Sequence, residues 1–159
     1  MSWACADRKR LLWLSALVAM LTACGTDDSP EAQLRAAVDA FVDAVEAAAP
    51  RAAGDILHSA YRDARHPDKR SAVATLFWYT RQHSAVHLFT AIRAIELDPS
   101  AGSARSRILV AMAGVPIESI ETLVSLNADL YRFDVDWQLE EGAWRVISSR
   151  WQRADLSSL

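Results

Sequence analysis

The sequence predicts an α+β domain in which three N-terminal helices are followed by four antiparallel strands. Apolar residues recur at helical spacing between residues 29 and 83, while residues 86–115 hold two apolar runs separated by a turn cluster. Residues 131–139 then alternate strictly between apolar and polar side chains, which is the period of a half-buried strand. Helices that precede an antiparallel sheet pack together on its apolar face, and this is the arrangement of an α+β domain.

The first predicted helix begins after Ser29 and runs to Ala49. Ser29 suits the N-cap, Pro30 suits the first helical position, and Glu31 places an acid in the first turn. The bulky apolar residues are spaced by four, three and four, so they share one face of an amphipathic helix. These residues are Leu34, Val38, Phe41 and Val45.

Two shorter helices are predicted next. One opens at Pro50 and ends before His66, with an apolar face made of Ile56, Leu57, Ala60 and Tyr61. The other starts at Pro67 or Asp68 and runs to about His83, with an apolar stripe of Val73, Leu76, Phe77 and Thr80. The stretch that holds this stripe is also rich in aromatic and β-branched residues, so a strand is the alternative there.

The character of the chain changes after Ala85. We expect one strand over Val86–Leu97, a turn over residues 98–102, and a second strand over Ala104–Val115 that ends before a proline. Residues 118–127 form a connection that could hold a helical turn.

The best local signal is the terminal hairpin. Its first strand, Tyr131–Leu139, has an apolar face formed by Tyr131, Phe133, Val135, Trp137 and Leu139. Residues 140–142 turn the chain, and Ala143–Arg153 returns as the partner strand.

The return strand does not alternate cleanly along its length. Trp144 and Val146 share one face, whereas Ile147 and Trp151 share the other. Either a bulge near Ser148-Ser149 shifts the face, or both faces of this strand are covered.

The N-terminus carries an export signal. Arg8, Lys9 and Arg10 precede an uncharged apolar run from Leu11 to Ala23, which has the length of a signal-peptide core and is short for a membrane span. Leu21-Thr22-Ala23-Cys24-Gly25 then resembles the lipobox of bacterial lipoproteins. This resemblance implies cleavage before Cys24, attachment of a diacylglyceryl group to its thiol, and acylation (palmitate or a similar chain) of the new amine.

The predicted organisation is a signal peptide over residues 1–23, a lipidated tether over 24–28, and one domain over 29–159. Loss of the leader takes Asp7 and three basic residues from totals of 20 acidic and 17 basic, which leaves 19 against 14 and a net charge of about −5. This balance argues against a nucleic-acid partner, whose binding depends on basic patches. With Cys24 lipidated, no second cysteine remains for a disulfide.

The order of elements and the hairpin DLYRFDVDWQLEEGAWRVISSRW resemble the nuclear transport factor 2-like (NTF2-like) superfamily, which includes SnoaL-like proteins. The matching features are an amphipathic first helix, a long penultimate strand, a tight glycine turn, and the form Gly142-x-Trp144-Arg145-Val146. The resemblance implies three helices packed on a curved four-stranded antiparallel sheet, an NTF2-like or cystatin-like cone with a pocket. It also makes a homodimer through the sheet face an expectation.

Enzymes of the superfamily work inside the cone with a carboxylate and Tyr, Asp or His partners. The candidate pocket residues here are His58, Tyr61, Tyr79, His87 and Arg93. None of them lies in a motif that matches a catalytic one, so no catalytic residue, metal or cofactor is assigned. Asp134 and Asp136 alternate with the aromatic face, and we expect them to point away from the core and pair with Arg105 or Arg107 across the sheet.

Other chemistry finds little support in the sequence. His83 and His87 are four residues apart, but the helix-to-strand change falls between them and no third metal ligand is evident. There is no glycine-rich phosphate loop and no hydrolase serine motif. Four tryptophans follow the leader and are predicted to be core or interface anchors: Trp78, Trp137, Trp144 and Trp151.

Two functions from different classes are therefore expected. The first is a non-catalytic, membrane-anchored binding or accessory domain for a small apolar ligand or a protein partner. The second is a small enzyme of isomerase or dehydratase type that acts on a hydrophobic substrate. A buried, mutually hydrogen-bonded Asp/Tyr/His set in a pocket would favour the enzyme, whereas a pocket filled by Trp and Phe would favour the binding domain.

The expected location is the cell envelope. Gly25 follows the lipidated cysteine, where an aspartate would retain many enteric lipoproteins at the inner membrane. In a Gram-negative host, the resemblance therefore implies the outer membrane, with the domain facing the periplasm.

Overall fold

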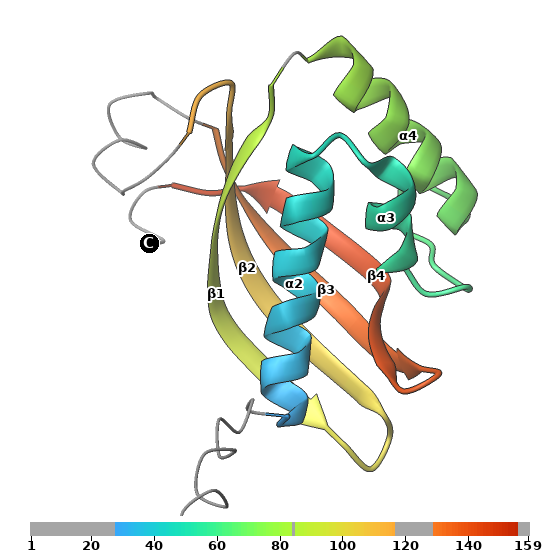
Figure 1. The fold of residues 1–159 in the computed structure, drawn as a ribbon. Coiled ribbons are helices and arrows are strands. Elements are labelled where there is room, and N and C mark those ends of the chain that lie inside the picture. Colours follow the sequence, from blue (N-terminus) through green and yellow to red (C-terminus); the bar gives the residue numbers. More distant parts are fainter. Residues whose placement is uncertain (1–27, 84, 117–128, 156–159) are drawn as a thin grey trace, which may run out of the picture.

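The computed structural model describes residues 28–83, 85–116 and 129–155. They form three helices, α2 (Pro30–Glu46), α3 (Pro50–Asp55) and α4 (Lys69–Gln82), followed by four strands, β1 (His87–Asp98), β2 (Ser103–Ala113), β3 (Asp129–Glu140) and β4 (Ala143–Arg153). The strands form one antiparallel sheet in the order β1-β2-β3-β4, and the helices lie on one side of this curved sheet (Figure 1). The predicted α+β class and element order are confirmed.

Two predicted segments lie outside the described residues. They are the leader together with the lipidated tether as far as residue 27, Cys24 included, and the 118–127 connection. In the part of the chain that the structure describes, no helix has both the length and the apolar content needed to cross a membrane.

Helix α2 forms as its sequence predicts. The Ser29 side chain accepts a hydrogen bond from the Ala32 amide at 3.2 Å, and the apolar stripe packs inward. The helix ends at Glu46, three residues before the expected end, and Ala48 adopts a left-handed φ of 51°. The break follows from Pro50, because a proline disfavours helical geometry in the residue before it.

The second helix is shorter than predicted. α3 ends at Asp55, and the next residues pair with β4: the Ile56 carbonyl accepts from the Val146 amide at 2.9 Å, and the His58 amide donates back to the Val146 carbonyl at 2.9 Å. The prediction of a helix continuing toward His66 was wrong, because these backbone groups find partners in a distant strand. Leu57 and Tyr61 are nevertheless buried, whereas Ala60 is exposed.

Residues 69–82 form a helix, so the strand alternative is excluded. A capping box at Asp68 and Ser71 starts α4. The inward-facing residues are Ala72, Val73, Leu76 and Tyr79. Phe77 was predicted on this stripe but is 42% exposed, and the Thr80 hydroxyl bonds to the Leu76 carbonyl within the helix.

The inward direction of Val73 has a physical cause. A Cβ on Gly54 would lie only 2.7 Å from Cγ2 of Val73, so α3 and α4 meet at a glycine. Val73 therefore lies against α3, whereas Phe77 is left exposed.

Two strands contain bulges. Arg93 is the extra residue of β1, because the register shifts between Ile92 and Ala94. On β4, Val146 pairs with Trp137 and Ser148 pairs with Asp136, which leaves Ile147 as the extra residue. Of the two alternatives for this strand, the bulge is thus the correct one, one residue earlier than expected, and it returns Trp151 to the face of Val146.

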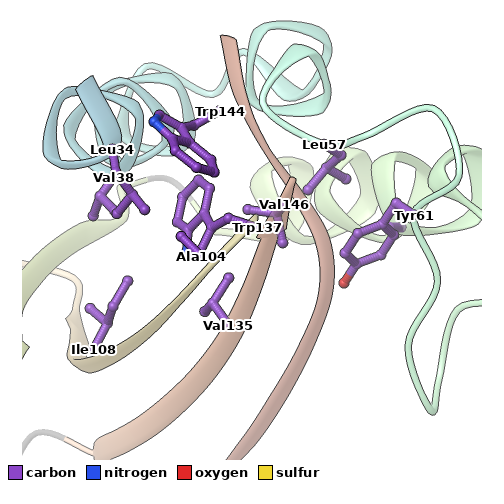
Figure 2. Close-up of a cluster of buried hydrophobic side chains, with 11 residues drawn as sticks. Leu34, Val38, Leu57, Tyr61, Ala104, Ile108, Val135, Trp137, Trp144 and Val146 are labelled. Atoms are coloured by element: carbon purple, nitrogen blue, oxygen red, sulfur yellow. The ribbon is translucent and has the colours of Figure 1, made fainter. Parts of the chain in front are cut away.

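The inner face of the sheet, which packs on the helices, carries the main core. Leu34 and Val38 of α2 pack with Trp144, Trp137 and the other side chains of this cluster (Figure 2). The Trp137 indole donates to the buried Ser106 hydroxyl at 2.8 Å, whereas the buried Trp144 indole N–H makes no hydrogen bond. The core assignment is confirmed for these two tryptophans.

Three apolar residues depart from the predicted core. Trp78 is 61% exposed and Trp151 is 42% exposed, so neither is a core residue. Leu139 belongs to the apolar alternation of β3 but is 44% exposed, because it lies next to the hairpin turn at Glu141 and Gly142.

Candidate functional site

The inner face of β3 and β4 divides into two halves. We call Val135, Trp137, Trp144 and Val146 the closed half, since all four are buried in the main core. Beyond the bulge lies the open half, formed by Tyr131, Phe133 and Trp151. The Trp151 ring meets Tyr131 edge-on at 5.2 Å and Phe133 at 6.4 Å between ring centroids, yet it remains 42% exposed.

A cation lies over this aromatic cluster. The Arg65 guanidinium carbon is 4.2 Å from the centroid of the Trp151 ring, within the range of a cation–π contact. Arg65 is exposed, and among the described residues no carboxylate forms an ion pair with it. The open half therefore combines an apolar platform with an unneutralised positive charge.

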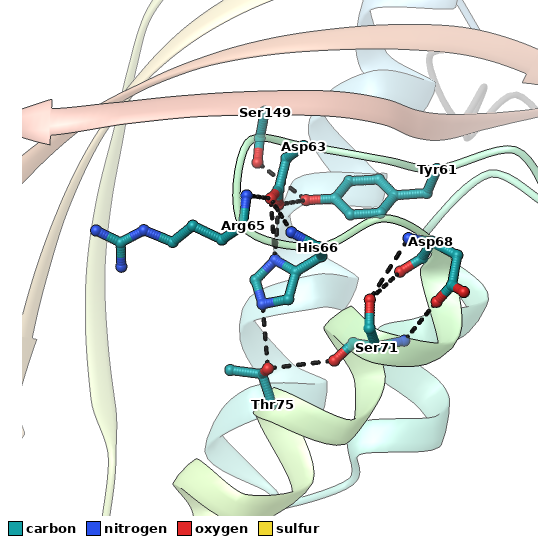
Figure 3. Close-up of polar contacts among 8 residues, drawn as sticks. All are labelled: Tyr61, Asp63, Arg65, His66, Asp68, Ser71, Thr75 and Ser149. Atoms are coloured by element: carbon teal, nitrogen blue, oxygen red, sulfur yellow. Dashed lines mark hydrogen bonds and ion pairs between the residues drawn. The ribbon is translucent and has the colours of Figure 1, made fainter.

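The loop that carries Arg65 is held by a polar network (Figure 3). The buried Tyr61 hydroxyl donates to Oδ2 of Asp63, and Nδ1 of His66 lies 2.9 Å from the same oxygen. The backbone amides of Arg65 and His66 both donate to Oδ1 of Asp63 at 2.7 Å. This is a mutually hydrogen-bonded Asp/Tyr/His set of the kind that would favour an enzyme.

The Asp63 carboxylate in this network has no free acceptor site, however. A carboxylate has about four acceptor sites, and Asp63 uses two on each oxygen. Burial opposes its ionisation, but the hydrogen bonds from Tyr61, His66 and the backbone outweigh burial and lower the pKa of Asp63 to about 2. A carboxylate so weakly basic, with no acceptor site left, is poorly suited to take a proton from a substrate.

The side chains of Tyr61 and His66 are likewise hydrogen-bonded within the protein. Burial, and then the hydrogen bond to Asp63, raise the pKa of the Tyr61 hydroxyl. Ser149 of β4 lies 3.1 Å from that hydroxyl, and Nε2 of His66 lies 3.1 Å from Oγ1 of Thr75 in α4. The network thus ties the 58–66 loop to both β4 and α4, which is a structural role.

The structure scatters the five candidate pocket residues. His58 faces Glu140 at the β3–β4 turn, Tyr61 belongs to the network, and Tyr79 stacks on His83 with 4.2 Å between centroids. His87 begins β1, and Arg93 is the exposed bulge residue of that strand. Among the described residues, no side-chain hydrogen bond, ion pair or ring contact joins two of the five.

The outer face of the sheet carries ion pairs. Asp134 pairs with Arg107 and Asp136 with Arg105, each at 3.2 Å and directly across the β2–β3 ladder. Both aspartates point away from the main core, as predicted. A shallow hollow of about 470 Å³ on this side is lined largely by charged and polar groups, among them Glu96, Arg105 and Asp136.

The histidines four residues apart do not share one element. His83 follows α4 and bonds through Nδ1 to the Tyr79 carbonyl, whereas His87 begins β1. Within the described ranges, no group of three His, Cys, Asp or Glu side chains is arranged to hold a metal ion.

Sequence reasoning missed Asp63, Arg65 and His66. One signal was available: an aspartate shortly before Pro67 is typical of an Asx turn, in which the side chain caps the amides that follow. Nothing local in the sequence indicates that Arg65 would lie over Trp151, because the two residues are 86 positions apart.

An open antiparallel sheet covered on one side by three N-terminal helices defines the NTF2-like and cystatin-like class of α+β folds. The chain matches an NTF2-like protein of unknown function from Silicibacter pomeroyi with a TM-score of 0.59 and 16% identity, over 82% of this chain and 100% of the other. It matches a cystatin-like domain of unknown function from Nostoc punctiforme with a TM-score of 0.61 and 12% identity, over 84% and 83%. The domain therefore has an NTF2-like fold.

A third similar structure comes from Novosphingobium aromaticivorans, and its name proposes a scytalone dehydratase activity. It matches with a TM-score of 0.58 and 9% identity, over 77% of this chain and 83% of the other. No family model matches the chain, and no curated protein matches it either. At these identities the likeness establishes the fold and carries no activity.

Proposed function

We propose that this protein is a lipid-anchored cell-envelope protein whose NTF2-like domain binds, without catalysis, an amphipathic ligand with an anionic group. The ligand's apolar body would lie on the open half of the inner face, against Trp151 and Tyr131. Its anionic group would pair with Arg65.

One observation carries this proposal: the Trp151 ring, which meets the half-buried Tyr131 edge-on and is 42% exposed, lies directly beneath a cation that has no ion-pair partner among the described residues. An arginine offers several N–H donors in a fixed plane, so it can contact an aromatic face and still bind a carboxylate or phosphate through its edge. A ligand with both apolar and anionic parts would satisfy both features.

Binding is favoured over catalysis by the state of the Asp/Tyr/His network. Its carboxylate has no acceptor site left and a pKa of about 2, and its tyrosine is tied to that carboxylate. In addition, Trp137 and Trp144 fill the closed half of the inner face. In the part of the chain that the structure describes, the Asp/Tyr/His network offers no free base that would match the scytalone dehydratase name of one similar structure.

The ligand test uses the mature chain with Cys24→Ser and a twelve-carbon carboxylate, dodecanoate, as probe. We expect dodecanoate to change tryptophan emission and to bind more tightly than dodecanol, which has the same chain without the charge. Arg65→Ala should weaken dodecanoate binding by about ten-fold or more, the usual effect of losing a hydrogen bond to a charged group. Arg62→Ala is the matched control, since Arg62 is exposed on the same loop and contributes a backbone bond to Ile147.

Equal affinity for dodecanoate and dodecanol would contradict the anionic part of the proposal. No binding, or equal effects of Arg65→Ala and Arg62→Ala, would contradict the site itself.

The anchor is tested separately. The proposal that Cys24 carries the lipid, with the domain at the periplasmic side of the outer membrane in a Gram-negative host, rests on the lipobox resemblance. Metabolic labelling with a palmitate analogue should mark the parent chain and leave Cys24→Ala unmarked. Label that survives the substitution would disprove lipidation at this residue.

The expected homodimer through the sheet face stays a proposal of the same kind. The face available for it is the outer one, where arginines and aspartates alternate across β2 and β3. Native mass spectrometry of the mature chain would give its oligomeric state.

A further inference from the structure

Helix α4 has a second apolar stripe that the core does not use. Ala74, Phe77, Trp78 and Arg81 are all exposed and are spaced by three, one and three, so they lie along one side of the helix. Trp78 is the most exposed of the large apolar residues described, at 61%, and Phe77 meets it edge-on at 5.7 Å between centroids. Figure 1 shows α4 at the periphery of the fold, outside α3.

The arginines beside this stripe are not neutralised by an acid within the helix, and the ammonium of Lys69 is held by the Leu57 carbonyl at 2.8 Å. α4 contains Lys69, Arg70 and Arg81 and no acidic residue; the nearest acid in sequence is its N-cap, Asp68. The Arg81 guanidinium lies 5.5 Å from the Phe77 ring. Among the described residues, neither arginine of α4 forms an ion pair, unlike the paired arginines of the outer sheet face.

We infer that the outward stripe of α4 rests on the anionic phospholipid surface to which the chain is anchored. Exposed Trp and Phe flanked by the exposed Arg70 and Arg81 suit the interfacial zone of a bilayer, where indole rings concentrate and anionic headgroups attract basic residues. This inference rests on the proposed lipid anchor, but it is independent of the ligand site.

The length of the tether supports this occupant. Five residues, from Cys24 to Asp28, separate the predicted lipid from the cap of α2, and even fully extended they span only about 17 Å. The anchor thus keeps the domain close to the bilayer, and at the resulting effective concentration a contact as small as two aromatic rings can persist. A second copy fits less well, because antiparallel pairing of two α4 helices would bring Arg70 close to Arg81 of the other copy.

The test uses the processed, lipidated protein in vesicles of equimolar phosphatidylcholine and phosphatidylglycerol. The phosphatidylcholine is either ordinary or brominated, since bromine quenches only indoles at the bilayer. Trp78 is one of four tryptophans left after the leader, so brominated lipid should remove up to about a quarter of the emission. Trp78→Phe should abolish this quenching, whereas Trp151→Phe, the other exposed tryptophan, should preserve it.

The charge contribution has its own matched pair. Arg81→Glu should reduce the quenching, because a negative charge replaces a positive one beside the anionic surface. Arg107→Glu places the same change on the outer sheet face and should leave the quenching unchanged.

Protein that floats with the vesicles and shows no quenching, or keeps its quenching in Trp78→Phe, would overturn the inference. Quenching lost in Trp151→Phe instead would overturn it too and place the open half at the membrane. Failure to float would overturn the anchor together with this contact, so the two failures are distinguishable.

Discussion

Trp137 and Trp151 occupy the same inner face of neighbouring strands, yet Trp137 is 3% exposed and Trp151 is 42% exposed. Strand geometry does not separate them, because both belong to the same alternation once the bulge at Ile147 is counted. They differ in what covers the ring. Trp137 packs in the cluster that includes Leu34 of α2, whereas the charged Arg65 lies over the Trp151 ring.

One sheet face therefore provides two different environments for its aromatic residues. In the closed half the chain fills the concave side with its own indoles, which removes apolar surface from water and stabilises the fold. In the open half a similar aromatic group is left partly in solvent beneath a cation. The buried core and the proposed ligand site therefore lie at opposite ends of β3 and β4.

The largest expected effect separates the two halves directly. Trp137→Ala should lower the free energy of unfolding by about 3–5 kcal/mol, because a buried indole and its hydrogen bond to Ser106 are lost. Trp151→Ala should cost below about 1 kcal/mol, as its ring is already half in solvent. Urea unfolding followed by circular dichroism measures both free energies. Equal losses would show that the two halves contribute equally to stability.

The Asp63 network connects the halves, since its loop carries Tyr61 of the core and Arg65 of the open half. Asp63→Asn should cost about 2 kcal/mol at neutral pH, because an amide cannot accept all four hydrogen bonds. Asp39→Asn, on the exposed side of α2, should change little. Similar losses of unfolding free energy for the two substitutions would show that the network does not stabilise the fold.

The same carboxylate predicts an acid dependence. Its pKa is lowered in the folded chain to about 2, from an ordinary value near 4, so it stabilises the fold above that ordinary value. This contribution should disappear as the pH falls from about 4 to about 2, and Asp63→Asn should lack it. Unfolding curves across that pH range check the slope; a parallel decline in both chains would contradict the assignment.

A smaller effect is expected for the two buried tryptophans of the closed half. Trp137→Phe removes the indole partner of the buried Ser106 hydroxyl, whereas Trp144→Phe removes an N–H that has no partner. We expect Trp137→Phe to be the more costly substitution by about 1–2 kcal/mol. Thermal or urea unfolding of the two single variants tests this, and the reverse order would show that the Trp144 indole has a partner after all.

The smallest effect concerns the outer face. The Arg107–Asp134 pair spans 3.2 Å, but the Arg107 side chain is 55% exposed, so Asp134→Asn should change the stability by only tenths of a kcal/mol. A loss above about 1 kcal/mol in urea unfolding would mean that the ladder of ion pairs acts as a unit.

Much of the fold could be predicted because its signals are local. The cap, proline and apolar spacing of α2 lie within one helix, and the alternation of β3 lies within one strand. The bulge in β4 was one of two alternatives that its broken alternation allowed, and the register with β3 decides for it. The end of α3 could not be predicted, because Ile56 and His58 bond to Val146, some 90 residues away.

The candidate site was less predictable for the same reason. Tyr61 was identified as a candidate, but its partners Asp63, His66 and Ser149 emerge only when the loop meets β4. The exposure of Trp78 and Trp151 also depends on what packs nearby, and an aromatic residue on an alternating or helical stripe has the same sequence signal whether it is covered or not.

By itself, the sequence determined the element types, their order, the antiparallel pairing and the outward direction of Asp134 and Asp136. These depend on side-chain periodicity and turn chemistry, which act between residues close in the chain. The tertiary structure alone decided which aromatic residues are covered, that the Asp63 carboxylate is saturated, and that Arg65 stands over Trp151. Those features depend on contacts between segments far apart in the chain, and a residue pattern does not encode the distance between them.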